Sequence, residues 1–252
     1  MIINLKLNKL RDKVSDTINF QNIFFLGIFL IPSAVFPGLI CILISLIYSL
    51  ISKKKSSLSK VSNLILIFSS GLMIFNTTAI YFRNLNNDIP NWSIIDSLIG
   101  LFNWLPFFII FWGLQPYLKS NKNREIFSIC IVSGSIPIIF TAIGQYFFKW
   151  HGPFELYGLI TWFQRPLAFN DGVTGLFNNP NYAGTWLSLV WPFSLEIFLR
   201  KNNNKTKKII SGSISLSILF TALLTLSRNT FIGLSITLIL SISFKFFLVI
   251  LF

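Results

Sequence analysis

The chain has 252 residues, of which 53% are apolar and 12% are charged, with a mean hydropathy of +0.69 and a net charge of +13. A soluble domain carries roughly a quarter charged residues, so this composition excludes a soluble protein. The basic charge does not indicate nucleic-acid binding, because 16 of the 21 lysines and arginines fall in four short segments beside apolar runs. These basic segments are 1–19, 52–60, 119–125 and 200–208. We therefore expect an all-α, polytopic integral membrane helix bundle that crosses a lipid bilayer about eight times.

The first apolar run, 20–52, follows a basic N-terminus that carries no small-residue cleavage site, so we expect it to remain as a membrane anchor. Two prolines and a glycine interrupt this run between Ile31 and Gly38. Proline and glycine favour a break, which predicts a hairpin of two short helices. A single tilted helix is the alternative.

The later apolar runs approach the 20 or so residues that a bilayer-spanning helix needs. They predict helices at 61–82, 95–118, 126–148, 180–199, 209–226 and 230–251. We accordingly divide the chain into a basic N-terminus (1–19), N-terminal membrane helices (20–118) and a C-terminal membrane region (119–252).

The positive-inside bias places the basic segments and the N-terminus in the cytoplasm. By alternation, segments 83–94, 149–179 and 227–229 emerge on the far side of the membrane. The segment 149–179 is the only loop large enough to hold chemistry. Its many aromatic side chains predict that it folds back over the helix ends, with a short interfacial helix near 154–164.

The sequence lacks several motifs that are typical of nucleotide-binding, redox and metal-dependent proteins. The sequence contains no G-x-x-x-x-G-K-[ST] loop, no C-x-x-C, no H-E-x-x-H and no D-x-D pair. We therefore expect neither a cofactor nor a protein-bound metal. The two cysteines, Cys41 and Cys130, lie inside apolar spans, where a disulfide is not expected.

Two arginines, Arg165 and Arg228, stand on the side where positive charge is disfavoured. Arg228 lies at a helix–helix turn, and the stretch 175–183 opens a helix that Asn179 or Asn181 can cap. A helix N-terminus offers free donors and partial positive charge, and arginine binds phosphate through two parallel bonds. The pattern predicts an anion site. The alternatives are arginines that contact lipid headgroups or backbone carbonyls, and an ordinary capped helix.

Three further groups in the same loop could take part in chemistry. Glu155 and Asp171 are candidate general bases, or else solvated loop carboxylates. His151 is a candidate catalytic residue, or else an interfacial histidine.

At these residues the sequence resembles the O-antigen ligase and polymerase family, through the pairing of G-x-F-x-N-P-N-x-A at a helix start with a later L-T-x-S-R turn. That family also includes protein O-oligosaccharyltransferases and a cyanobacterial member proposed as an inorganic-carbon transporter. The resemblance covers roughly residues 120 to 252. The matching residues are Gly175, Phe177, Asn179, Pro180, Asn181, Ala183, Thr225, Ser227 and Arg228.

The resemblance implies a bacterial inner-membrane enzyme that transfers a glycan from a polyprenyl diphosphate carrier to a lipid or glycan acceptor at the periplasmic face, without metal. Arg228 and Arg165 would stabilise the diphosphate leaving group, with His151 as the third catalytic candidate. The implied substrate-binding residues are Asn179, Asn181, Ser227 and Asp171.

One part of the family pattern is not found in this sequence: a further periplasmic loop with a functional histidine, followed by more helices. We expect the sequence to be a fragment, to be completed by a partner, or to be inactive as a transferase. Two other functions stay open: a transporter of a small anion such as bicarbonate, and a non-catalytic protein of envelope assembly.

Overall fold

The computed structural model describes residues 19–52, 60–84, 93–158, 160–200 and 203–241, and these residues are mostly helical. They form two compact units. Unit 1 draws on residues up to 21 and on 43–123, and unit 2 draws on 22–42 and on 124 onward. The predicted N-terminal segment 1–19, most of the segment 83–94 and the end of the last helix fall largely outside the described residues.

The apolar run 20–52 forms a helical hairpin, as one of the two sequence interpretations predicts. Helix α2 covers Phe20–Leu30 and helix α3 covers Val35–Ile51. In unit 2, Gly27 of α2 lies against Ile42 of α3, and in unit 1 the ring of Phe20 stacks on Tyr48 with centroids 3.8 Å apart. Contacts between early α2 and late α3 require antiparallel helices, so the single tilted helix was wrong.

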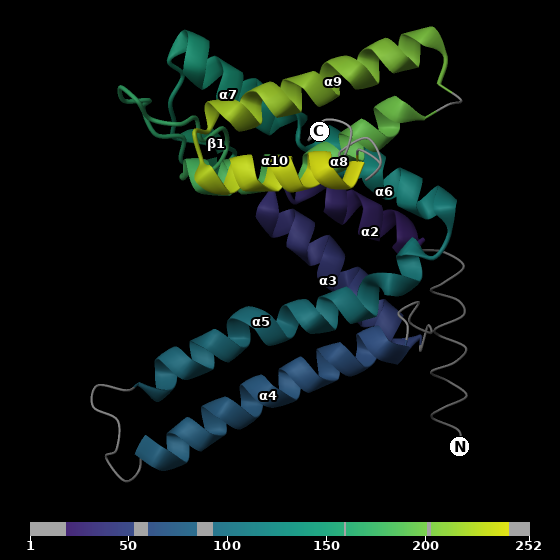
Figure 1. Cartoon of the computed structure of the whole chain (residues 1–252), viewed down its shortest axis with the longest axis vertical. Helices are drawn as coiled ribbons and strands as arrows, with labels where there is room; N and C mark the ends of the chain where they lie inside the picture. The colour runs from purple at the N-terminus through teal and green to yellow at the C-terminus, as the bar shows by residue number, and fades with distance from the viewer. Residues whose placement is uncertain (1–18, 53–59, 85–92, 159, 201–202, 242–252) are drawn as a thin grey trace, which may run out of the picture. The chain divides into compact units, whose positions relative to one another are not determined.

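Unit 1 also contains helix α4 (Lys60–Asn84), helix α5 (Ile94–Leu114) and the 3₁₀ helix η1 (Gln115–Leu118). Helices α4 and α5 lie side by side (Figure 1). The Tyr117 hydroxyl donates to the Ser45 carbonyl at 2.8 Å, and the Ser49 hydroxyl donates to the Gly113 carbonyl at 2.6 Å. These bonds fix the end of α5 to α3 within this unit.

Unit 2 contains α6 (Asn121–Gly134) from Arg124 onward, together with α7 (Ile136–Phe148), α8 (Pro180–Leu199), α9 (Lys205–Leu224) and α10 (Arg228–Ser241). The predicted helix at 126–148 lies within one candidate membrane span, Asn121–Phe148, but it is interrupted at Ser135. Pro137 has no N–H to donate to the preceding turn, and the Ser135 hydroxyl donates to the Ile131 carbonyl at 2.8 Å.

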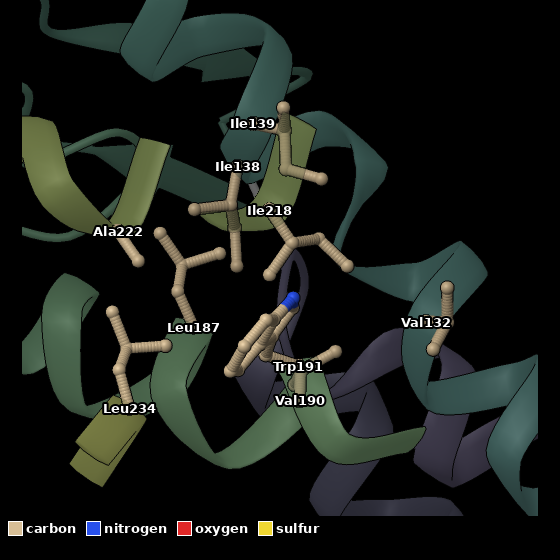
Figure 2. Packing of buried hydrophobic residues seen from close by; sticks show 9 residues of the cluster. All are labelled: Val132, Ile138, Ile139, Leu187, Val190, Trp191, Ile218, Ala222 and Leu234. Atoms are coloured by element: carbon tan, nitrogen blue, oxygen red, sulfur yellow. The ribbon is translucent and has the colours of Figure 1, made fainter. Parts of the chain in front are cut away.

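The core of unit 2 lies between helices α6 to α10, which contribute packed apolar side chains (Figure 2). Helix α8 is central, since it packs against both α9 and α10. Burial removes these side chains from any solvent, and close packing supplies the dispersion contacts that hold helices together in lipid. The cluster comprises Val132, Ile138, Ile139, Leu187, Val190, Trp191, Ile218, Ala222 and Leu234.

A short antiparallel hairpin lies in the loop between α7 and α8. Strand β1 (Phe154–Leu156) pairs with strand β2 (Ile160–Trp162), with Phe154 opposite Trp162. The predicted interfacial helix near 154–164 was therefore wrong. Tyr157 and Gly158 both have positive φ in the connecting turn, a conformation that terminates regular helix and reverses the chain.

The loop 149–179 folds back only in part. The Trp162 indole donates to the Ser33 carbonyl at 2.6 Å, and residues 172–175 are buried. Tyr157 at the hairpin tip is 92% exposed and Phe163 is 65% exposed. The prediction of a packed loop is confirmed for Trp162 and for residues 172–175, and was wrong for Tyr157, Phe163 and Phe169, the last of which is 95% exposed.

The two ends of unit 2 differ in charge. At one end, the start of α6 and the segment 200–208 meet through the ion pair between Arg200 and Glu125. We call this the basic end. At the other end, the loop 149–179 meets the turn between α9 and α10, and we call this the loop end. The separation of these segments agrees with the predicted alternation of loops.

Four helical segments of the described chain are long and apolar enough to cross a membrane: Val61–Arg83, Ile95–Leu118, Asn121–Phe148 and Lys205–Leu224. Three shorter apolar helices accompany them: Phe20–Leu30, Val35–Ile51 and Arg228–Leu240. The expected bilayer environment is consistent with these helices, and the number of about eight crossings stays a prediction.

Candidate functional site

The two segments that carry the family-like motifs meet at the loop end. A side chain at Gly184, in the first turns of α8, would collide with the hydroxyl of Thr230 on α10, and Gly233 of α10 lies against Ser188 of α8. The first turns of the two helices contact each other, and so do their later turns, which means that α8 and α10 run in parallel. Both helices therefore present their N-termini, with their partial positive charge, at the same end.

The loop before α8 also touches the turn before α10. The Val173 N–H donates to the Leu224 carbonyl at 3.1 Å. Gly172 packs so closely on the Thr225 carbonyl that no side chain could replace its hydrogen. Arg228 follows Thr225 by three residues, and Asp171 immediately precedes Gly172. The structure thus brings the loop of Arg165 and Asp171 against the turn of Arg228.

Arg165 forms an ion pair with Asp171 at 3.4 Å, and the two side chains are 44% and 38% exposed. An ion pair this exposed contributes about 0–1 kcal/mol to stability. A multiply charged anion could therefore replace the carboxylate at little cost. The sequence predicted a role for each residue on separate grounds, and the structure shows that they form an ion pair.

Gln145 of α7 positions this loop, and sequence reasoning missed it. Its side chain is fully buried, and its amide donates to the Arg165 carbonyl at 2.8 Å. Its carbonyl oxygen accepts from the N–H groups of Thr174 at 2.7 Å and Gly175 at 3.3 Å. The sequence did contain a signal for this role, a glutamine inside an apolar run. Polar side chains in membrane spans need hydrogen-bond partners.

The turn before α10 is strained and leaves one polar atom unpaired. Leu226 has φ of 50°, a left-handed conformation that costs a leucine roughly 1–2 kcal/mol. The hydroxyl of Ser227 is buried and has no hydrogen-bond partner among the described residues. Arg228 is exposed, and no ion pair with it occurs in the described part of the chain. Its guanidinium is therefore accessible to a ligand.

The start of α8 is capped as predicted. The Asn179 side-chain oxygen accepts from the Asn181 N–H at 2.8 Å, and Pro180 occupies the first helical position. Asn179 therefore has a structural role. The Asn181 side chain is exposed at the same helix start. Whether either residue also binds substrate stays a prediction.

His151 is exposed at the beginning of the loop, and its Nδ1 lies 3.2 Å from the Lys149 carbonyl oxygen. The N–H of the next residue, Gly152, donates to the Gln164 carbonyl at 2.7 Å. Gly152, next to His151, and Gln164, next to Arg165, are thus joined by a backbone hydrogen bond. Glu155 lies on β1 opposite Thr161 and is also exposed.

No group of three or more histidine, cysteine or carboxylate side chains that could hold a metal ion occurs in the ranges that the structure describes. The chemistry that the loop end offers is electrostatic: two arginines and two helix N-termini that favour an anion, with one carboxylate and one histidine nearby.

The described residues form a mostly helical fold with four helical segments that are long and apolar enough to cross a membrane. No family model, curated protein or solved structure matches the chain. The resemblance to the O-antigen ligase and polymerase family accordingly rests on the motif residues, and the function built on it is a proposal.

Proposed function

We propose that the protein is a membrane glycosyltransferase of the O-antigen ligase type, which transfers a glycan from a polyprenyl diphosphate carrier to a lipid or glycan acceptor. The observation that carries the proposal is the packing of Gly172 and Val173 against the turn of Leu224 and Thr225. Two segments some fifty residues apart, each with an arginine, would have no need to meet if the arginines served only as separate lipid contacts.

The proposed site lies at the loop end of unit 2. Arg165 and Arg228 bind the diphosphate, and the N-termini of α8 and α10 add their partial positive charge. An acceptor hydroxyl oxygen forms a bond to the anomeric carbon, and the bond from that carbon to the diphosphate oxygen breaks. The diphosphate keeps the electron pair, and His151 takes the hydroxyl proton. Arginine stabilises this step because negative charge grows on the leaving group.

The remaining polar residues bind the substrate in this proposal. Asp171 holds Arg165 until the diphosphate arrives, and Ser227 supplies a hydroxyl that is not yet bonded. Asn181 faces outward at the start of α8 beside the cap residue Asn179. No step needs a metal ion, since the two arginines neutralise the charge.

The proposal includes an orientation: about eight membrane helices in a bacterial inner membrane, with the N-terminus cytoplasmic and the loop end periplasmic. The meeting of Arg200 with the start of α6 supports it, because two basic segments then share one side. A carrier-linked glycan would reach the loop end from the periplasmic leaflet.

A transfer assay in proteoliposomes tests the proposal. The donor is a polyprenyl-diphosphate-linked glycan, and released polyprenyl diphosphate is measured in the presence of a chelator. We expect Arg228→Lys to lower release by roughly tenfold or more, because lysine retains charge but loses the planar fork that binds phosphate. Lys149→Gln is the control, since it removes a positive charge at the start of the loop 149–179. Equal rates for Arg228→Lys and the unaltered protein would overturn the catalytic assignment.

A further inference from the structure

A cavity of about 310 Å³ opens at the basic end of unit 2, away from the proposed active site. Its walls come from α6, α8 and α9. Helix α9 lines it from Lys207 to Ile214, a rise of about 10 Å along the helix axis. This length is comparable with the roughly 15 Å of hydrocarbon that one leaflet of a bilayer contributes.

The deep part of this cavity is aliphatic. Its lining includes Ile129 and Val132 of α6, Ile197 of α8, and Ile210 and Ile214 of α9. Three serines also line the cavity, Ser133, Ser194 and Ser211, and each donates its hydroxyl hydrogen to a backbone carbonyl of its own helix. The lining therefore offers few hydrogen bonds to a ligand and favours an apolar occupant. An acyl chain fulfils that requirement.

The mouth of the cavity is polar and carries Glu125, Arg200, Asn203 and Lys207. Arg200 is already engaged: it donates to both carboxylate oxygens of Glu196 at 2.9 Å and pairs with Glu125. The bond to Glu196, more than the nearby charge of Glu125, raises the pKa of Arg200 above its ordinary value. The ammonium of Lys207 has no ion-pair partner in the part of the chain that the structure describes. Lys207 is therefore the charge at the mouth that remains free for a ligand.

The first turn of α9 gives a second reason to expect an anion. It carries Lys205, Lys207 and Lys208. Cations at a helix N-terminus oppose the helix dipole and destabilise the helix, whereas an anion there stabilises it. Membrane orientation accounts for lysines anywhere in this segment, but it does not require one of them to line an aliphatic cavity.

We propose that this cavity binds one membrane glycerophospholipid, with its phosphodiester at Lys207 and an acyl chain between α6 and α9. The aliphatic walls match the chain, and the free ammonium and the start of α9 match the phosphate. Such a site is the kind of basic interhelical pocket that recognises phospholipid headgroups. The proposal is independent of glycan transfer, because none of the lining residues belongs to the loop end.

Native mass spectrometry of the detergent-purified chain tests the proposal, with phosphatidylglycerol, phosphatidylethanolamine and diacylglycerol that carry the same acyl chains. We expect one phospholipid retained per chain, and diacylglycerol retained at least fivefold less. Lys207→Ala should weaken phospholipid retention by about fivefold. Lys205→Ala is the matched control, since it removes the same charge from the same turn outside the cavity, and it should change retention by less than twofold. A preference between the two phospholipids identifies the headgroup.

A second pair of variants tests the acyl-chain position. Ile129→Trp fills the cavity and should reduce retention, whereas Leu216→Trp places the same bulk on an exposed position of α9 outside the cavity. Equal losses for Lys205→Ala and Lys207→Ala would mean general attraction to basic charge and would overturn the proposal. Unchanged retention in Ile129→Trp, or diacylglycerol bound as well as phospholipid, would also overturn it.

Discussion

Replacement of Gln145 by methionine should destabilise the loop end more than any other single change of a buried polar side chain in that region. Methionine keeps the length of the side chain but removes the amide. The buried N–H groups of Thr174 and Gly175 then lose their acceptor. Each buried unpaired donor costs about 1–3 kcal/mol. With the lower half of that range for two donors, we expect a loss of about 3 kcal/mol in the free energy of unfolding.

The matched control is Gln164→Met. Gln164 is as buried as Gln145, but its side-chain oxygen already lacks a partner and its amide makes one bond, to the Thr141 carbonyl at 3.1 Å. Its replacement should cost about 1 kcal/mol or less. Unfolding in mixed micelles gives both values, and hydrogen exchange at residues 165–175 should rise only in Gln145→Met. Equal stability of the two variants would refute the positioning role of Gln145.

Two further predictions concern packing and orientation. Gly184→Ala should lower the free energy of unfolding by about 1–3 kcal/mol, because the added methyl overlaps the Thr230 hydroxyl. Gly71→Ala is the control and should be neutral or stabilising, since its methyl meets only open space. Comparable unfolding curves for the two variants would contradict the tight parallel packing of α8 and α10. In a chain with Cys41 and Cys130 replaced by serine, an impermeant thiol reagent applied from the periplasmic side should label Asn170→Cys and not Lys205→Cys, and the reverse pattern would overturn the orientation.

The helices were predictable where a charge-free run coincided with a local start signal. Helix α8 begins at Pro180 and ends at Leu199, as predicted, because Asn179 caps it and proline fits the first position. The interruption of the helix at Ser135 was not predicted, although Pro137 in the sequence indicated it. Apolar content decides whether a segment can enter a bilayer, but a single proline decides where its helix is interrupted.

The hairpin at 154–162 was not predictable from composition. Phe154, Leu156, Ile160 and Trp162 suit an interfacial helix or a strand equally well when only apolar content is considered. The structure selects strands because the chain reverses at Tyr157 and Gly158 with positive φ. Aromatic content correctly predicted that Trp162 packs, since its indole bonds to Ser33, but it did not predict the exposure of Tyr157, Phe163 and Phe169.

The candidate site was predictable as a list of residues and not as an arrangement. Arg165 and Arg228 were predicted because they lie on the side of the membrane where positive charge is disfavoured. No pattern in the sequence linked Arg165 to Asp171 or Gln145 to Thr174. Such pairs depend on which segments fold against each other. The contact of Gly172 with Thr225 joins two segments some fifty residues apart, and a single sequence does not reveal it.

The central claim is that the loop end acts on a diphosphate-linked glycan, and one measurement in proteoliposomes tests it against the rival function of anion transport. Release of polyprenyl diphosphate and uptake of labelled bicarbonate are followed in the same preparation, with a chelator present. The account predicts release that depends on Arg228, and no uptake above that of empty liposomes. Bicarbonate uptake without any release of polyprenyl diphosphate would contradict it.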